Sequence, residues 1–227
     1  MPTRPTILLT GFGPFPGMSR NATAVLVPGL AAAARPRFDS HNIVSAVLPC
    51  EWTAAPERLA ELLENARAVL ALHFGVSHTA QGFDVELTSH NVRQPVHDAA
   101  GELPATACIA ETGPARLATT LPAERILARL SHLGLPCRSS HDAGGYLCNT
   151  LLYHSLTVAD QRGGSFLSGF VHVPANLTGH GDDGEDPHPD CPLDWDDAIA
   201  GGLEIIAASL EASAEAGTPA RAHASTS

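Results

Sequence analysis

Short apolar runs alternate along the chain with segments whose apolar residues recur every three or four positions. The runs predict β-strands over residues 7–10, 43–48, 68–74, 83–87 and 166–173. The other segments predict helices over residues 56–66, 122–132, 147–156 and 195–212, and one that starts near Asn21 and is interrupted at Pro28-Gly29. This alternation predicts a single-domain, three-layer α/β/α fold with a largely parallel sheet. We expect the domain to cover residues 1–213 and the small, polar residues 214–227 to form a disordered tail.

Composition narrows the class of protein. The 227 residues are 44% hydrophobic, enough for a sizeable core, and carry a net charge of −11 with only 13 basic residues. That balance argues against nucleic acid or an anionic membrane as a partner. No apolar run has the length of a membrane span, and the N-terminus lacks the apolar core of a signal peptide. The five cysteines are scattered without a CxxC pair, so free thiols and a cytoplasmic location are expected.

A cysteine and a histidine stand where nucleophilic chemistry would place them. Cys148 follows the turn at Gly144-Gly145 and enters a segment with helical periodicity. In the first turn of a helix, backbone N–H groups and the helix dipole favour a thiolate and can stabilise an oxyanion. His172 lies 24 residues later at the end of an apolar strand, where it can act as a base. The pair predicts a cysteine hydrolase.

Four sequence blocks resemble those of the pyroglutamyl peptidase I family, the pyrrolidone-carboxylate peptidases of cysteine peptidase clan CF. The resemblance runs from about Ile7 to Leu210. The blocks are Thr10-Gly11-Phe12-Gly13-Pro14-Phe15, Gly75-Val76 through Val85-Glu86, Asp142-Ala143-Gly144-Gly145-Tyr146-Leu147-Cys148-Asn149 and Gly169-Phe170-Val171-His172-Val173-Pro174.

The resemblance implies an activity and a site. Members of the family remove an N-terminal pyroglutamyl residue from peptides through a thioester, with no metal or other cofactor. Carried over by position, Cys148 is the nucleophile, His172 the general base and acid, and Glu86 the residue that orients the imidazole. The substrate-binding residues would be Phe12, Phe15 and Tyr146, which sandwich the pyrrolidone ring, and Val76, whose backbone bonds the lactam. The expected partners are small pyroglutamyl peptides, and the resemblance leaves a homo-oligomer open.

Other interpretations of the same residues remain. Cys50, Cys108 and Cys137 are expected to be core residues, and Glu86 is also compatible with a solvated position on a strand. The acidic loop 179–190 has residue types that bind divalent metal, but its irregular spacing favours a solvated loop. Two alternative functions stay open. One is a hydrolase of another small cyclic or amide substrate, and the other is a catalytically silent binding module.

Overall fold

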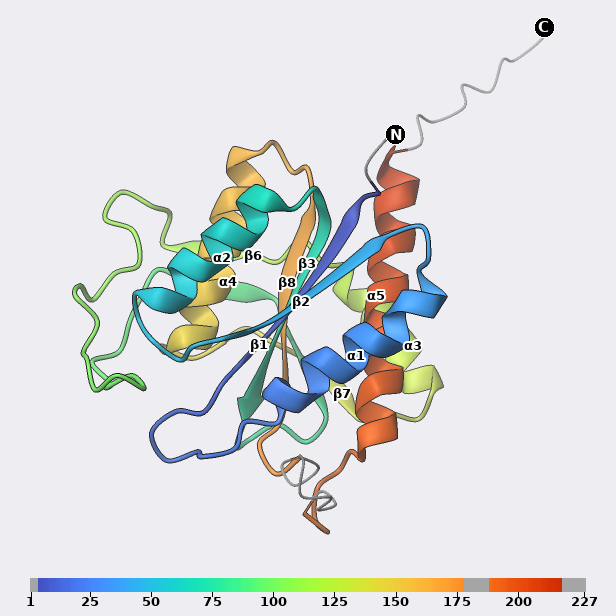
Figure 1. The fold of residues 1–227 in the computed structure, drawn as a ribbon, viewed down its shortest axis with the longest axis horizontal. Coiled ribbons are helices and arrows are strands. Elements are labelled where there is room, and N and C mark those ends of the chain that lie inside the picture. The colour runs from blue at the N-terminus through green and yellow to red at the C-terminus, as the bar shows by residue number, and fades with distance from the viewer. Residues whose placement is uncertain (1–3, 178–187, 218–227) are drawn as a thin grey trace, which may run out of the picture.

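Six strands form the central sheet in the order β2-β1-β3-β8-β4-β7 (Figure 1). The computed structural model describes residues 4–177 and 188–217. The strands are β1 (Thr6–Phe12), β2 (Asn42–Leu48), β3 (Ala68–Ser77), β4 (Phe83–Glu86), β7 (Cys137–Ser140) and β8 (Leu167–Pro174). The pairs β2-β1, β1-β3, β3-β8 and β4-β7 are parallel, whereas β4 runs antiparallel to β8. The sheet is therefore largely parallel, as expected, with one antiparallel junction at β8.

Helices cover both faces of this sheet, which confirms the three-layer prediction. On one face lie α1 (Thr23–Arg37), α3 (Ala123–His132) and α5 (Trp195–Gly217), and on the other lie α2 (Ala54–Asn65) and α4 (Leu147–Gln161) (Figure 1). Successive residues of a strand face opposite sides. In β1, Ile7 and Leu9 join the core beneath α1 and α5, while Leu8 joins the core beneath α2 and α4. Burial on both faces explains the continuous apolar runs.

The expected break in the first helix does not occur. Pro28 and Pro36 both lie inside α1, which continues to Arg37. Pro28 is on the exposed side of the helix, so water can bond the carbonyl that lacks an N–H partner. The inner side of α1 buries Leu26, Val27 and Leu30, and this burial holds the helix together across the proline.

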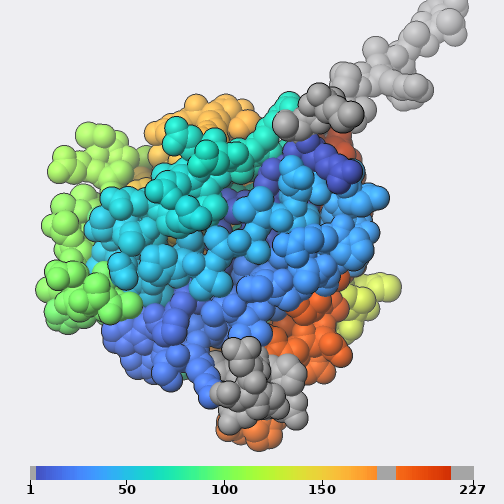
Figure 2. All heavy atoms as spheres, viewed as in Figure 1, coloured from blue at the N-terminus to red at the C-terminus, as the bar shows by residue number. Residues whose placement is uncertain are grey.

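Several elements were not predicted. The strand β7 carries polar residues at the edge of the sheet, and β5 (Thr88–His90) and β6 (Arg116–Ala118) form a separate two-stranded sheet. Between β5 and β6, residues 91–115 form an arm without helix or strand, visible as the green segment at the edge of the molecule (Figure 2). The buried amide of Asn149 anchors its base, since it bonds the backbone of His90 and the carbonyl of Val92.

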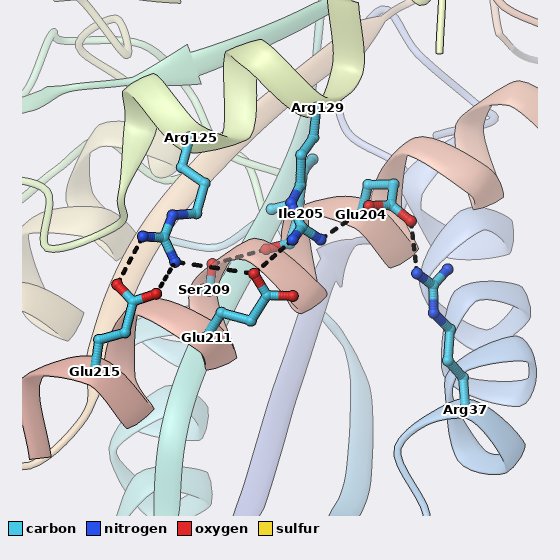
Figure 3. A network of polar contacts seen from close by, with 8 residues as sticks. All are labelled: Arg37, Arg125, Arg129, Glu204, Ile205, Ser209, Glu211 and Glu215. Atoms are coloured by element: carbon cyan, nitrogen blue, oxygen red, sulfur yellow. Dashed lines mark hydrogen bonds and ion pairs between the residues drawn. The ribbon is translucent and has the colours of Figure 1, made fainter. Parts of the chain in front are cut away.

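The last helix is fixed by charge as well as by apolar packing. Asp194 accepts the N–H of Asp197 at 2.7 Å, as expected of an N-cap. Arginines of α1 and α3 alternate with glutamates of α5 in an extended ion-pair network (Figure 3), made by Arg37, Arg125, Arg129, Glu204, Glu211 and Glu215. The helix runs to Gly217, four residues beyond the expected domain boundary. The rest of the predicted tail, residues 218–227, and most of the acidic loop 179–190 lie outside the described residues. In the part of the chain that is described, no helix is long and apolar enough to span a membrane.

Candidate active site

A cleft of about 420 Å³ opens at the carboxyl ends of the central strands, where sites in open α/β sheets are expected. Every site residue suggested by the sequence lines it: Phe12, Phe15, Val76, Glu86, Tyr146, Cys148 and His172. A larger depression of about 800 Å³ lies around the opposite strand ends, beside Thr6 and Asn42. None of the suggested residues lines that depression, so the cleft is the candidate site.

Cys148 is the second residue of α4, as the helical pattern predicted. The turn before it depends on two glycines. Gly144 has φ of +81°, and a Cβ on Gly145 would lie 2.4 Å from the Gln94 side chain. The N-cap residue, Tyr146, contributes no side-chain hydrogen bond to the helix start. The first-turn N–H groups have no carbonyl partner within the helix, so they remain available beside the sulfur for an anionic oxygen.

His172 and Glu86 form a buried pair next to this sulfur. The imidazole Nδ1 lies 2.7 Å from Glu86 Oε1, and both residues are buried, at 7% and 1% exposure. Because Nδ1 faces the carboxylate, Nε2 is the nitrogen left for the Cys148 side chain, to which His172 also hydrogen-bonds. Burial alone would lower the pKa of His172, but the adjacent Cys148 and Glu86 outweigh it and raise the pKa to about 10. The geometry thus favours an imidazolium between sulfur and carboxylate, and a solvated Glu86 is ruled out.

Three aromatic side chains form one wall of the cleft. The Phe15 and Tyr146 rings lie 6.2 Å apart, and Phe12 lies 6.4 Å from the ring of Phe170 beneath it. Trp52 meets Tyr146 edge to face with the ring centroids 5.0 Å apart. This wall is built of aromatic rings, which suits a flat, uncharged group.

The residues that hold this wall were not predicted from the sequence. The carboxylate of buried Asp98 accepts the N–H of Trp52 at 2.8 Å, and the indole of Trp52 donates to the carbonyl of Val96. The hydroxyl of Tyr146 donates to the carbonyl of His97. Residues 96–98 of the arm therefore position the aromatic wall from behind. Their irregular backbone has no periodicity that could have revealed this.

Cys50 is also more than the core residue that was expected. It is buried, at 4% exposure, but it lines the cleft. Burial, followed by the charge of Cys148, raises the pKa of the Cys50 thiol to about 12. Its sulfur lies 3.6 Å from the carbonyl oxygen of Gly13. The structure thus distinguishes a protonated thiol at residue 50 from the sulfur of Cys148, which is paired with His172.

Within residues 4–177 and 188–217, no group of three or more His, Cys, Asp or Glu side chains has a geometry that could hold a metal ion. The acidic loop that carried the metal interpretation is mostly outside these ranges.

Comparison with known proteins agrees with this geometry. The family model described as pyroglutamyl peptidase matches residues 5–209. Pyrrolidone-carboxylate peptidases from Vibrio vulnificus and Pyrococcus furiosus are 34% and 30% identical over 172 and 169 residues. Those alignments cover 74% of this chain and 77% and 80% of the relatives. The structure of a mutant pyrrolidone carboxyl peptidase from Pyrococcus furiosus superposes with a TM-score of 0.79 at 26% identity, covering 91% of this chain and 99% of that one. This chain belongs to the pyroglutamyl peptidase family.

Proposed function

We propose that the protein is a cysteine peptidase that removes N-terminal pyroglutamyl residues from peptides. The observation that carries the proposal is that Cys148 lies next to the buried pair of His172 and Glu86, beside an aromatic wall in one cleft. A nucleophile, a base and a group that orients the base are the three parts that covalent acyl transfer needs. The match to the family model over residues 5–209 supports the same activity.

The proposed reaction has two steps. In the first, the Cys148 thiolate attacks the pyroglutamyl carbonyl carbon, and first-turn N–H groups of α4 stabilise the oxyanion. His172 gives its Nε2 proton to the leaving amine as the C–N bond breaks, and a thioester remains. In the second, His172 takes a proton from water, hydroxide attacks the thioester, and pyroglutamate leaves as the thiolate is restored. Glu86 keeps the imidazole oriented and stabilises its positive charge in both steps.

Substrate choice follows from the wall and the nearby backbone. A pyrrolidone ring is flat and uncharged, so it can pack against Phe12, Phe15 and Tyr146. The backbone around Val76, at the end of β3, would bond the lactam. A glutaminyl terminus would place an ammonium in an apolar slot, where lost hydration far exceeds the gain from contact. A prolyl ring would fit but would leave a buried donor unpaired, at about 1–3 kcal/mol.

A comparison of fluorogenic amides tests the proposal. The expected order of cleavage is pyroglutamyl well above prolyl, with glutaminyl negligible and Cys148→Ala inactive on all three. Equal cleavage of the three amides would leave only a general cysteine hydrolase, and cleavage of none would favour the binding module. The proposed chemistry uses protein groups alone, so EDTA should not lower the rate. A loss of activity in EDTA that added zinc restores would contradict a reaction that uses protein groups alone.

We also propose a cytoplasmic, reducing environment. All five cysteines are free thiols. The proposed nucleophile works only while its sulfur is reduced, and reducing compartments maintain that state. Activity that requires a thiol reductant in vitro would support the assignment, whereas full activity after prolonged oxidation would contradict it.

A further inference from the structure

A guanidinium group lies in the cleft on the side away from Phe12. Arg138 belongs to β7, at the edge of the sheet, whereas Phe12 belongs to β1, on the other side of β3 and β8. Arg138 Nε and Nη2 donate to the two carboxylate oxygens of Asp84 at 2.7 and 2.6 Å. The Asp84 side chain is 6% exposed, but the Arg138 side chain is 56% exposed. A buried carboxylate thus holds an arginine whose far edge faces the cleft and solvent.

This arginine keeps unused hydrogen-bond donors. A guanidinium has five N–H groups in a planar fork. Two of them engage Asp84, and Nη2 also reaches the carbonyl oxygen of Thr79 at 3.4 Å. In the described part of the chain, Nη1 has no hydrogen-bond partner. Its two N–H groups can therefore bind an acceptor that enters the cleft, and a carboxylate is the acceptor such a fork binds best.

The strand register places this donor beyond the scissile bond. Asp84 is directly opposite His172 in the antiparallel pair, where facing side chains are about 5 Å apart. Arg138 is opposite Asp84 one strand further out, so its backbone lies about 10 Å from that of His172 by strand spacing. If the ring packs against the aromatic wall, as proposed, a leaving peptide that continues along the cleft past His172 runs toward Arg138. An extended chain spans about 3.5 Å per residue, so the second or third residue after the scissile bond reaches it.

We propose that Arg138 is a specificity-determining residue that binds a carboxylate of the leaving peptide. The inference rests on the proposed function. Apart from the histidines His78 and His172, the other charged residues of the cleft wall are acidic, namely Asp84, Glu86 and Asp142, and the chain carries a net charge of −11. An acidic leaving peptide would be repelled by such a site, and Arg138 offsets that repulsion where the peptide leaves. The carboxylate can be the C-terminus of a short peptide or an Asp or Glu side chain.

Two matched substrate pairs separate these sources. The first is pyroglutamyl-Ala-Ala with a free carboxyl terminus against its C-terminal amide, and the second is pyroglutamyl-Ala-Glu-amide against pyroglutamyl-Ala-Gln-amide. The measurement is the ratio of kcat/KM within each pair for wild type and Arg138→Gln. Loss of a half-exposed, charge-assisted contact should lower the acid-to-neutral ratio about five- to tenfold. The pair whose ratio falls identifies the source.

The controls remove a structural explanation. Arg138→Gln leaves the buried carboxylate of Asp84 without its ion pair, so the double variant Asp84→Asn/Arg138→Gln, which removes both charges, must show the same fall. Arg138→Lys keeps a charge for Asp84 but lacks the free fork, and it should lower the ratio as well. In wild type, raising the ionic strength should lower the ratio by screening. If the ratios stay constant in all variants and at all salt concentrations, Arg138 only joins β7 to β4 through Asp84. That result would overturn this inference and leave the proposed function intact. A wild type that cleaves no substrate of either pair would overturn the proposed function and this inference with it.

Discussion

The sulfur of Cys148 lies 2.9 Å from the point where a Cβ atom on residue 75 would be placed. Residue 75 is a glycine near the carboxyl end of β3, so the strand passes close to the sulfur of the proposed nucleophile. The same point lies 2.7 Å from Cζ of Phe170, so a larger residue has no free direction in which to move. Gly75 therefore fixes how closely α4 approaches the sheet at the reacting atom.

Gly75→Ala should damage catalysis far more than binding. The added methyl must displace either the sulfur or the Phe170 ring, and displacement by about 1 Å can cost roughly a hundredfold in rate. We expect kcat to fall by that order while KM changes little, as measured with a pyroglutamyl amide. Gly29→Ala is the matched control, since its methyl would meet only Ile199 at 3.4 Å, far from the cleft. Equal kcat for Gly75→Ala and wild type would contradict the close packing.

Alkylation should separate the nucleophile from the other thiols. Cys148 alone among the described cysteines hydrogen-bonds to a histidine that carries a raised pKa, so limiting iodoacetamide should label it first. Residual activity should fall in parallel with the fraction of unmodified Cys148 measured by peptide mass mapping. Cys148→Ala should lose several orders of magnitude in rate. Cys137→Ala is the control because Cys137 bonds only Ser131 and Leu127, away from the cleft. Full activity with Cys148 alkylated would end the assignment.

Glu86→Gln should keep the shape of the site and remove the negative charge beside His172. The carboxylate bonds His172 through Oε1, while Oε2 is buried with no hydrogen-bond partner in the described part of the chain. An amide would no longer stabilise the imidazolium, and related triads lose up to about 10⁴-fold in kcat from such a change. We expect a loss of at least 10²-fold with normal thermal unfolding. Glu61→Gln, a surface residue paired with Arg58, is the control and should cost nothing measurable. Comparable rates for the two variants would reduce the triad to a dyad.

The sequence predicted the parts of this site that depend on local pattern. The turn at Gly144-Gly145 and the periodicity after it placed Cys148 at a helix start, and the apolar run ending at His172 placed that residue on a strand. Glu86 was placed on a strand by alternation, but its burial against His172 depends on the antiparallel pairing of β4 with β8, which no local pattern encodes. The pair Asp84–Arg138 depends on β7, whose polar residues suggested no strand.

The support behind the aromatic wall was hidden for a similar reason. Asp98 and Trp52 are 46 positions apart and meet only because the irregular arm folds back over the start of α2. Pro28 did not end the helix, because burial of the inner face of α1 outweighed the tendency of proline to interrupt a helix. Local pattern thus pointed to the residues proposed to carry the chemistry, while long-range pairing determined which residues hold them in place.

A buried histidine beneath the site should make stability depend on pH. His73 is fully buried, with Nδ1 2.7 Å from Thr10 Oγ1 and Nε2 2.9 Å from Ser155 Oγ. Burial lowers the pKa of His73 from 6.5 to about 3. Below pH 6.5 the unfolded chain therefore binds a proton at this residue that the folded chain does not, and stability is lost as pH falls.

The contribution of His73 to the pH dependence of stability can be measured separately. One titrating group contributes about 1.4 kcal/mol per pH unit between its two pKa values. His73→Gln keeps partners for Thr10 and Ser155 but cannot titrate. Denaturant unfolding at pH 6, 5 and 4 should show wild type losing about 1.4 kcal/mol per unit more than the variant, because carboxylates and other histidines contribute equally to both. His172, whose pKa is raised, loses its contribution only as pH rises above 6.5 and does not interfere here. Parallel curves for the two proteins would mean that His73 becomes protonated without unfolding the chain.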